Sequence, residues 1–136
     1  MSGAKPIEVA AALIFRHGRL LITQRQPDAH LGGFWEFPGG KRETGESWEA
    51  CLIREIQEEL GVQMIVGRLF ETITHVYPEK TVHLQFYTGT LPHGEPRPLG
   101  CAACRWVGRE ELDQFAFPAA DARLLAQLKS PQQVWA

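Results

Sequence analysis

Three glutamates in one short stretch, Glu55, Glu58 and Glu59, have the residue type and the spacing to bind a divalent cation. In a helix, residues three and four positions apart lie on one face, so the three carboxylates are expected to lie together. Like charges at this spacing destabilise a helix by roughly a few tenths of a kcal/mol per pair, and within the helix only Arg54 is close enough to offset them. An ordinary solvated face explains this crowding poorly. A hard cation removes the repulsion, and carboxylates without Cys or His favour Mg²⁺, with Mn²⁺ as a substitute.

The residues before this stretch form a loop suited to a metal and a phosphate. Gly39 and Gly40 allow close approach of the backbone and can direct a carbonyl at the ion. Lys41 can offset the negative charge of a bound phosphate. A metal, a phosphate and a carboxylate base together indicate metal-assisted hydrolysis.

A known motif runs through the same residues. Gly40 is followed after five residues by Glu46 and, after seven more, by the run REIQEELGV, residues 54–62. This pattern over residues 40–62 resembles the Nudix box of the Nudix hydrolases. The stretches QRQPDAHLGGFWEFPGGK before it and FPAAD after it resemble the MutT-like branch, so that the resemblance covers most of the chain.

The resemblance implies a fold and a reaction. The fold is one Nudix hydrolase domain over residues 1–136, of class α+β, with the family's α/β/α sandwich in which a mixed β-sheet lies between helices. The reaction is hydrolysis of a nucleoside triphosphate to a monophosphate and pyrophosphate, with attack of water on a phosphorus of the polyphosphate.

The resemblance also assigns roles to the box residues. Glu55, Glu58 and Glu59 would bind the metal together with the carbonyl of Gly39. Arg54 would hold a neighbouring carboxylate in place, and Glu46 would brace the loop against the helix. The general base is Glu58 or Glu59, and the sequence does not choose between them.

Four further residues match nucleotide-binding positions of MutT-like proteins. Arg25 matches an arginine that contacts the phosphates, and Lys80 stands where a second basic residue is common. Each is equally compatible with a solvated cation at the end of a strand. His30 and Phe37 match residues that line the nucleotide pocket, although an aromatic residue in a strand is more often part of the core.

Two positions depart from the MutT pattern. Gly100 lies in the loop where MutT-like proteins often carry a glutamate that acts as a further metal ligand or base. Because that glutamate is absent here, the general base cannot be assigned by analogy with MutT. Asp121 occupies the position of an asparagine that reads oxidised guanine. An ionised aspartate only accepts hydrogen bonds, so it suits base edges that donate, such as guanine N1–H and N2–H₂ or cytosine N4–H₂. The alternative for Asp121 is a carboxylate at a helix start, favoured by the helix dipole.

Hydrophobic patterning and breakers predict the elements that position these residues. The predicted strands are 7–15 and 19–25, joined at His17-Gly18, then 65–76 and 81–91, joined at 77–80, and 104–107; residues 34–37 form a short aromatic stretch. Pro38-Gly39-Gly40 is expected to act as a breaker. One helix is predicted from the N-cap Ser47 to the stop at Gly61, and another from Pro118 to about Lys129.

Composition narrows the class of protein. With 136 residues, 44% hydrophobic, the chain can bury the core of one domain. A net charge of −2 gives no basic surface for a nucleic acid duplex, and no apolar run is long enough to span a membrane. An odd count of cysteines, Cys51, Cys101 and Cys104, favours a reducing, cytoplasmic location, and the lone CxxC lacks partners for a zinc site. Both a monomer and a homodimer are compatible with the sequence.

The leading hypothesis is therefore a Mg²⁺-dependent hydrolase that removes damaged nucleotides, foremost 8-oxo-dGTP, from the nucleotide pool. An enzyme acting on CTP or on modified nucleotides is the alternative. A non-catalytic nucleotide sensor is a third class, and the intact Nudix box argues against it.

Overall fold

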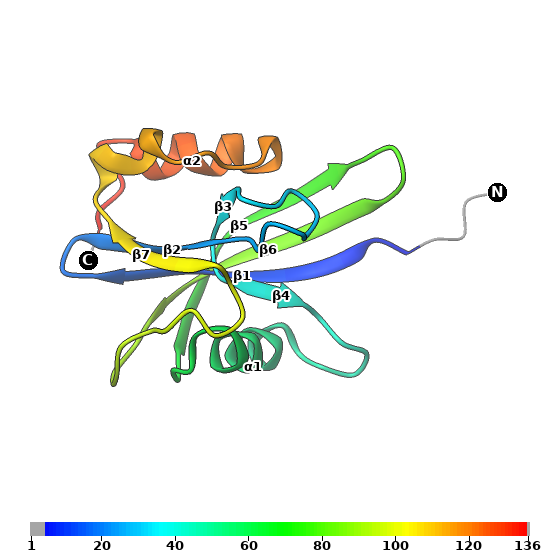
Figure 1. Ribbon diagram of the computed structural model, residues 1–136, viewed down its shortest axis with the longest axis horizontal. Coiled ribbons are helices and arrows are strands. Elements are labelled where there is room, and N and C mark those ends of the chain that lie inside the picture. Colours follow the sequence, from blue (N-terminus) through cyan, green and yellow to red (C-terminus); the bar gives the residue numbers. More distant parts are fainter. Residues whose placement is uncertain (1–4, 136) are drawn as a thin grey trace.

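A sheet of seven strands separates the two α-helices, one on each of its faces, in the computed structural model, which describes residues 5–135 (Figure 1). The α/β/α arrangement expected from the sequence is confirmed. The strands are β1 (Ile7–Arg16), β2 (Arg19–Gln24), β3 (Trp35–Glu36), β4 (Gly39–Lys41), β5 (Ile65–Val76), β6 (Thr81–Thr90) and β7 (Ala103–Val107). The helices are α1 (Trp48–Leu60) and α2 (Ala122–Lys129), with 3₁₀ turns η1 (Arg109–Gln114) and η2 (Ala119–Asp121).

The central strand β1 connects all parts of the sheet. It pairs in parallel with β6 along its length, in the order β3-β2-β1-β6-β5. Its other edge is divided, because β4 pairs with the first half of β1 and β2 with the last residues. The short strand that carries Gly39 and Gly40 is thereby fixed against the middle of the fold.

Two antiparallel hairpins supply the strands that surround the site. The turn between β1 and β2 has positive φ at His17 (52°) and Gly18 (74°), as in the type I′ turns that suit tight hairpins. The β5 and β6 strands pair up to Val76 and Thr81, and Tyr77 donates its amide to the Lys80 carbonyl at 2.7 Å in the turn. Both hairpins agree with the sequence prediction.

Helix α1 begins and ends where the sequence signals place it. The Ser47 hydroxyl accepts a hydrogen bond from the Ala50 amide at 3.0 Å, and Gly61 closes the helix in the left-handed region with φ 70°. The loop before β7 covers the same end, since the amides of Leu99 and Gly100 both donate to the Glu59 carbonyl at 3.0 Å. The helix carrying the acidic residues is therefore fixed at both ends.

Successive side chains of β1 point to opposite faces of the sheet and so divide the core into two layers. Ala10, Ala12 and Ile14 pack on the α1 side, whereas Ala11 and Leu13 pack on the α2 side. The residues of β1 in both layers are buried, so β1 lies at the centre of the fold. Within residues 5–135, no helix is long and apolar enough to cross a membrane.

Two local predictions were wrong, and one element was missed. Gly39 and Gly40 were expected to break regular structure but form β4, because β1 approaches so closely that a Cβ on Gly39 would lie 2.0 Å from the Ala10 carbonyl oxygen. The last helix begins at Ala122 rather than at Pro118, which instead precedes the turn η2. The turn η1 was not predicted, since its packing on α2 has no local sequence signal.

Candidate active site

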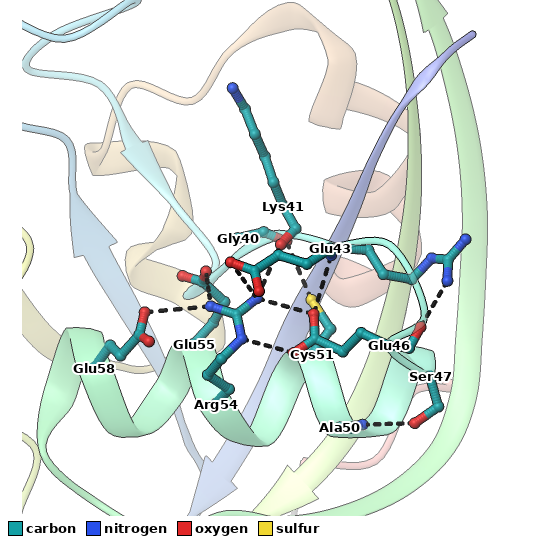
Figure 2. Close-up of polar contacts among 11 residues, drawn as sticks. Gly40, Lys41, Glu43, Glu46, Ser47, Ala50, Cys51, Arg54, Glu55 and Glu58 are labelled. Atoms are coloured by element: carbon teal, nitrogen blue, oxygen red, sulfur yellow. Dashed lines mark hydrogen bonds and ion pairs between the residues drawn. The ribbon is translucent and has the colours of Figure 1, made fainter.

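Arg54 is the centre of a network that joins α1 to the loop before it (Figure 2). Its guanidinium donates to both carboxylate oxygens of Glu46, at 2.6 and 2.9 Å, and to the Lys41 carbonyl at 3.1 Å. The hydrogen bonds from Arg54 are the main reason why the pKa of Glu46 falls to about 2. The expected contact of Glu46 between loop and helix is present, with Arg54 as its partner.

Two of the three clustered carboxylates also bind Arg54. Its Nη1 lies 2.8 Å from Glu55 Oε2 and 3.3 Å from Glu58 Oε1. Burial raises the pKa of Glu55, and the hydrogen bond and charge of Arg54 oppose that shift. Glu58 is 61% exposed, so its pair with Arg54 is the weaker one.

Gly40 is needed because the Glu55 carboxylate lies directly against its backbone. A Cβ at Gly40 would lie 2.2 Å from the carboxyl carbon of Glu55. We expect Gly40→Ala to lower the free energy of unfolding by about 1–3 kcal/mol, because the half-buried carboxylate must leave its contact with Arg54. Urea denaturation measures this. In a Glu55→Ala background the same change should cost less than about 0.5 kcal/mol, and an equal cost in both backgrounds would contradict the mechanism.

Glu59 points away from this network. Its carboxylate faces a separate cavity, and its Oε1 is buried without a hydrogen-bond partner. Burial raises the pKa of Glu59 to about 8, and the charges of Glu36 and Glu55 raise it further. A buried carboxylate oxygen without a partner is costly, and a bound cation would satisfy it.

The helical spacing places three carboxylates on one face, but their side chains diverge. Glu55 and Glu58 turn to Arg54, whereas Glu59 turns into the cavity. Within the described part of the chain, no three acidic, His or Cys side chains converge as a group that could hold a metal. The donors present, the carboxylates of α1 and among them the unsatisfied Glu59 oxygen, are nevertheless of the type that Mg²⁺ and Mn²⁺ prefer.

The cavity has a volume of about 320 Å³ and is lined by the first halves of β1 and β6, by β3 and β4, and by the segments that follow β2 and precede α2. All six residues expected to bind substrate line it: Arg25, His30, Phe37, Lys41, Lys80 and Asp121. Gly39, Gly40 and Glu59 line it too. The structure therefore brings the expected nucleotide-binding residues and one box carboxylate to a single cavity.

Arg25 is fixed at the wall of this cavity. Its Nε donates to the His30 carbonyl at 2.6 Å, and its Nη1 donates to Glu36 Oε1 at 2.9 Å. Lys80 lies with its ammonium 5.7 Å from the centre of the Tyr77 ring. Phe37 is only 5% exposed and stacks on Phe117, so it belongs to the core while its edge lines the cavity.

Glu36 and Tyr77 line the cavity and were missed by the sequence reasoning. The signal for Glu36 was the alternation in the stretch WEF, where Trp35 and Phe37 pack in the α2-side layer and the charged residue between them must face the other way. Burial raises the pKa of Glu36, and the nearby Arg25 opposes this shift. Tyr77, which contacts the His30 ring edge-on, had no signal beyond its place in a turn.

Asp121 is 7% exposed and faces the same cavity. Asp121 stands at the N-cap position of α2, as the alternative of a carboxylate at a helix start expects, although its side chain accepts no hydrogen bond from a helix amide. Burial raises the pKa of Asp121 to about 7, and the charge of Glu36 contributes to that shift. At neutral pH Asp121 is therefore a mixture of the neutral and the ionised form.

The three cysteines take no part in a metal group within residues 5–135. Burial raises the pKa of Cys51 to about 11 and that of Cys101 to about 12, which keeps both as thiols.

The loop at Gly100 contacts α1 through its backbone. A Cβ at Gly100 would lie 3.3 Å from the Glu59 Cα, at the position where MutT-like proteins often carry a further glutamate.

Comparisons with known proteins agree with this geometry. The NUDIX domain family matches residues 10–127. An 8-oxo-dGTP diphosphatase of Proteus vulgaris is 41% identical over 91 residues, covering 66% of this chain and 81% of that protein. The chain belongs to the NUDIX family. A CTP pyrophosphohydrolase of Escherichia coli K12 is 36% identical over 121 residues, covering 89% of this chain and 90% of that NUDIX relative.

The fold of this NUDIX protein matches solved structures as well. A MutT protein from Methanosarcina mazei superimposes with a TM-score of 0.81 at 26% identity, covering 93% of this chain and 96% of that one. The resemblance to the Nudix hydrolases and the expected sandwich are thus confirmed. Hydrolases of this family generally need a divalent metal.

Proposed function

We propose that the protein is a Mg²⁺-dependent nucleoside triphosphate pyrophosphohydrolase that releases a monophosphate and pyrophosphate. The observation that carries this is the single cavity in which Arg25, Lys41 and Lys80 lie with the box carboxylate Glu59. Cationic side chains there suit a polyphosphate, and the carboxylate suits its counter-ion. The names of the relatives favour 8-oxo-dGTP as the substrate.

The proposed ligands of the metal are the Gly39 carbonyl and the carboxylates of Glu55, Glu58 and Glu59. When bound, Mg²⁺ would polarise phosphoryl oxygens and stabilise the leaving pyrophosphate. Arg54 contacts both Glu55 and Glu58 and holds their carboxylates close to the loop. Glu58 or Glu59 accepts the proton of the attacking water. The raised pKa of Glu59 makes its ionised form a stronger base than an ordinary glutamate.

The cavity residues bind and orient the nucleotide. Arg25, held by Glu36 and the His30 carbonyl, contacts the phosphates together with Lys80 and Lys41. Phe37 and Asp121 lie deeper, where they contact the base. We place the reaction in the cytoplasm, where free nucleotides and the three free cysteines are both expected, with the protein as a monomer or homodimer.

A second candidate substrate is CTP or a modified pyrimidine nucleotide. The similarity to a CTP pyrophosphohydrolase and the aspartate at position 121 favour it. A non-catalytic sensor remains the least supported class, because all three box glutamates and Arg54 are present.

The function is tested by pyrophosphate release with Mg²⁺ from 8-oxo-dGTP, dGTP, CTP, 5-methyl-dCTP and 2-hydroxy-dATP. We expect kcat/KM for 8-oxo-dGTP to exceed that for dGTP by at least about tenfold. The Glu58→Gln variant is the blank, because its exposed side chain can change without unfolding the protein. A higher kcat/KM for cytidine nucleotides would select the second candidate, and no release from any triphosphate would refute the proposal.

A further inference from the structure

Two buried polar side-chain atoms have no hydrogen-bond partner among residues 5–135. They are the hydroxyl oxygen Oγ1 of Thr23 on β2 and the carboxylate oxygen Oε1 of Glu59 on α1. Thr23 is 0% exposed, and the proposed reaction makes no use of its hydroxyl. Buried oxygens are costly without a partner, and most are satisfied by the protein or by a buried water. If the two atoms lie close together, one water can satisfy both.

Strand pairing places the Thr23 side chain on the α1 side of the sheet. Successive residues of a strand alternate between faces, and Leu21, two residues before Thr23, packs in the core layer on the α1 side. Cys104, directly opposite Thr23 on β7, packs against the same layer. Glu36, directly opposite on β3, faces the same way. The Thr23 hydroxyl is therefore buried on the face of β2 that α1 covers.

The loop before β7 connects this part of β2 to Glu59. The Gly100 amide donates to the Glu59 carbonyl at 3.0 Å, and two residues later the Ala102 amide donates to the Gln24 carbonyl at 2.8 Å. Gln24 is the residue that follows Thr23 on β2. Glu59 and Thr23 are therefore held on opposite sides of one three-residue link.

Glu36 approaches both residues from the other side. It is the cross-strand neighbour of Thr23, and after burial its charge is the largest cause of the raised pKa of Glu59. Cys101, within the three-residue link, has its pKa raised by burial and then by the charge of Glu59. Thr23, Glu36 and Glu59 thus surround one polar region between β2, β3 and α1.

We propose that one buried water bridges Thr23 Oγ1 and Glu59 Oε1, and that Thr23 positions the Glu59 carboxylate through this water. A hydroxyl and a water both donate and accept, so the bridge forms whether Glu59 is ionised or neutral. Glu36 offers a third partner, and about three is the usual number for a buried water.

The bridge has a consequence for metal binding, which rests on the proposed function because Glu59 is a ligand only there. Groups that hydrogen-bond to a ligand fix its orientation, and their loss typically lowers metal affinity by about 10–100-fold. Each carboxylate oxygen has two lone pairs, so Glu59 can accept from the water and still offer its remaining lone pairs to a cation. Thr23 is therefore a positioning residue rather than a ligand.

The bridge is tested by thermal unfolding of Thr23→Val in two backgrounds, wild type and Glu59→Met, in EDTA at pH 7. Valine has the shape of threonine without the hydroxyl, so removal of a hydroxyl that has no partner should leave Tm unchanged or raise it. We expect instead that Thr23→Val lowers the Tm of the wild type by about 4 °C and causes no loss in Glu59→Met. The control is Thr74→Val on β5, where the hydroxyl bonds to His83 Nδ1 at 2.9 Å, and it should change Tm equally in both backgrounds.

Mn²⁺ binding without nucleotide, measured from the EPR signal of the free ion, tests the positioning of Glu59. We expect Thr23→Val to raise the Kd by about tenfold, whereas Thr23→Ser should stay within about threefold of the wild type. Thr74→Val should leave the Kd unchanged. If Thr23→Val does not fold, Thr23→Ser and Thr23→Ala make the same comparison in both measurements, because they differ only by the hydroxyl.

Equal Tm changes of Thr23→Val in the two backgrounds, or an unchanged Mn²⁺ affinity, would overturn the inference and leave the hydrolase function in place. A wild type that binds no Mn²⁺ and releases no pyrophosphate would refute the proposed function. In that case a Tm loss that depends on Glu59 would still establish the bridge.

Discussion

Replacing Glu59 by glutamine will lower kcat for the preferred nucleoside triphosphate by about 10²–10³-fold, because the change removes a ligand charge at the point where the metal and the polyphosphate meet. Glutamine keeps the size of the side chain and one oxygen, so the fold is retained. The matched control is Glu49→Gln, the same change on an exposed position in the first turn of α1. That control should alter kcat by less than about twofold, and equal losses in both variants would exclude the assigned role.

The same substitution has an opposite effect on the stability of the metal-free protein. Folding raises the pKa of Glu59 from 4.5 to about 8, so the folded state holds a proton that the unfolded state releases. Stability is therefore greatest at low pH within this window and falls as pH rises from about 5 to 8. Glu59→Gln removes the ionisable group, so we expect the variant to be more stable than the wild type at pH 8, by on the order of 2 kcal/mol.

Thermal unfolding at pH 5 and pH 8, with and without Mg²⁺, measures this effect. Without metal, the variant and the wild type should differ at pH 8 and converge at pH 5. Mg²⁺ should raise the Tm of the wild type at pH 8 more than that of the variant. A wild-type Tm that rises between pH 5 and pH 8 without metal, with no such rise in the variant, would show that Glu59 is ionised in the folded protein.

Local sequence signals were sufficient to predict the helix and the hairpin that position the candidate site. Ser47 and Gly61 marked the ends of α1, and His17-Gly18 marked the first hairpin, because caps and turns depend on residues close in sequence. The motif spacing then placed Glu55, Glu58 and Glu59 on one helix. These predictions agree with the structure because each depends on a few neighbouring residues.

The features that the sequence did not predict depend on contacts between segments that are distant in the chain. Helical spacing gives the direction of Glu59 from the axis but not its burial, which depends on segments distant in the chain, among them Gly39 on β4 and the loop at Gly100. The raised pKa of Asp121 comes from its burial and, in addition, from the charge of Glu36, which is 85 positions away in the chain (121 − 36). Likewise, β4 pairs with β1 because glycine at position 39 permits a very short distance between the two strands. None of these facts is encoded in a local pattern.

Replacing Arg54 by lysine is expected to be the most destabilising conservative change on α1. The guanidinium contacts Glu46, Glu55 and Glu58 and the Lys41 carbonyl at once, with its side chain 25% exposed. Lysine keeps the charge but cannot donate in a plane to two carboxylates. The half-buried Glu55 and Glu46 would then lose hydrogen bonds, at a cost of about 2–3 kcal/mol in the free energy of unfolding.

Urea denaturation of the metal-free protein measures this cost, and Arg123→Lys is the control. Arg123 also pairs with a glutamate, Glu71, at 3.4 Å, but its side chain is 66% exposed, so its loss should cost less than about 0.5 kcal/mol. Mg²⁺ should restore more stability to Arg54→Lys than it adds to the wild type, because the cation neutralises the carboxylates that the guanidinium no longer holds. Equal stabilisation of both proteins by Mg²⁺ would mean that Arg54 and the metal do not act on the same carboxylates.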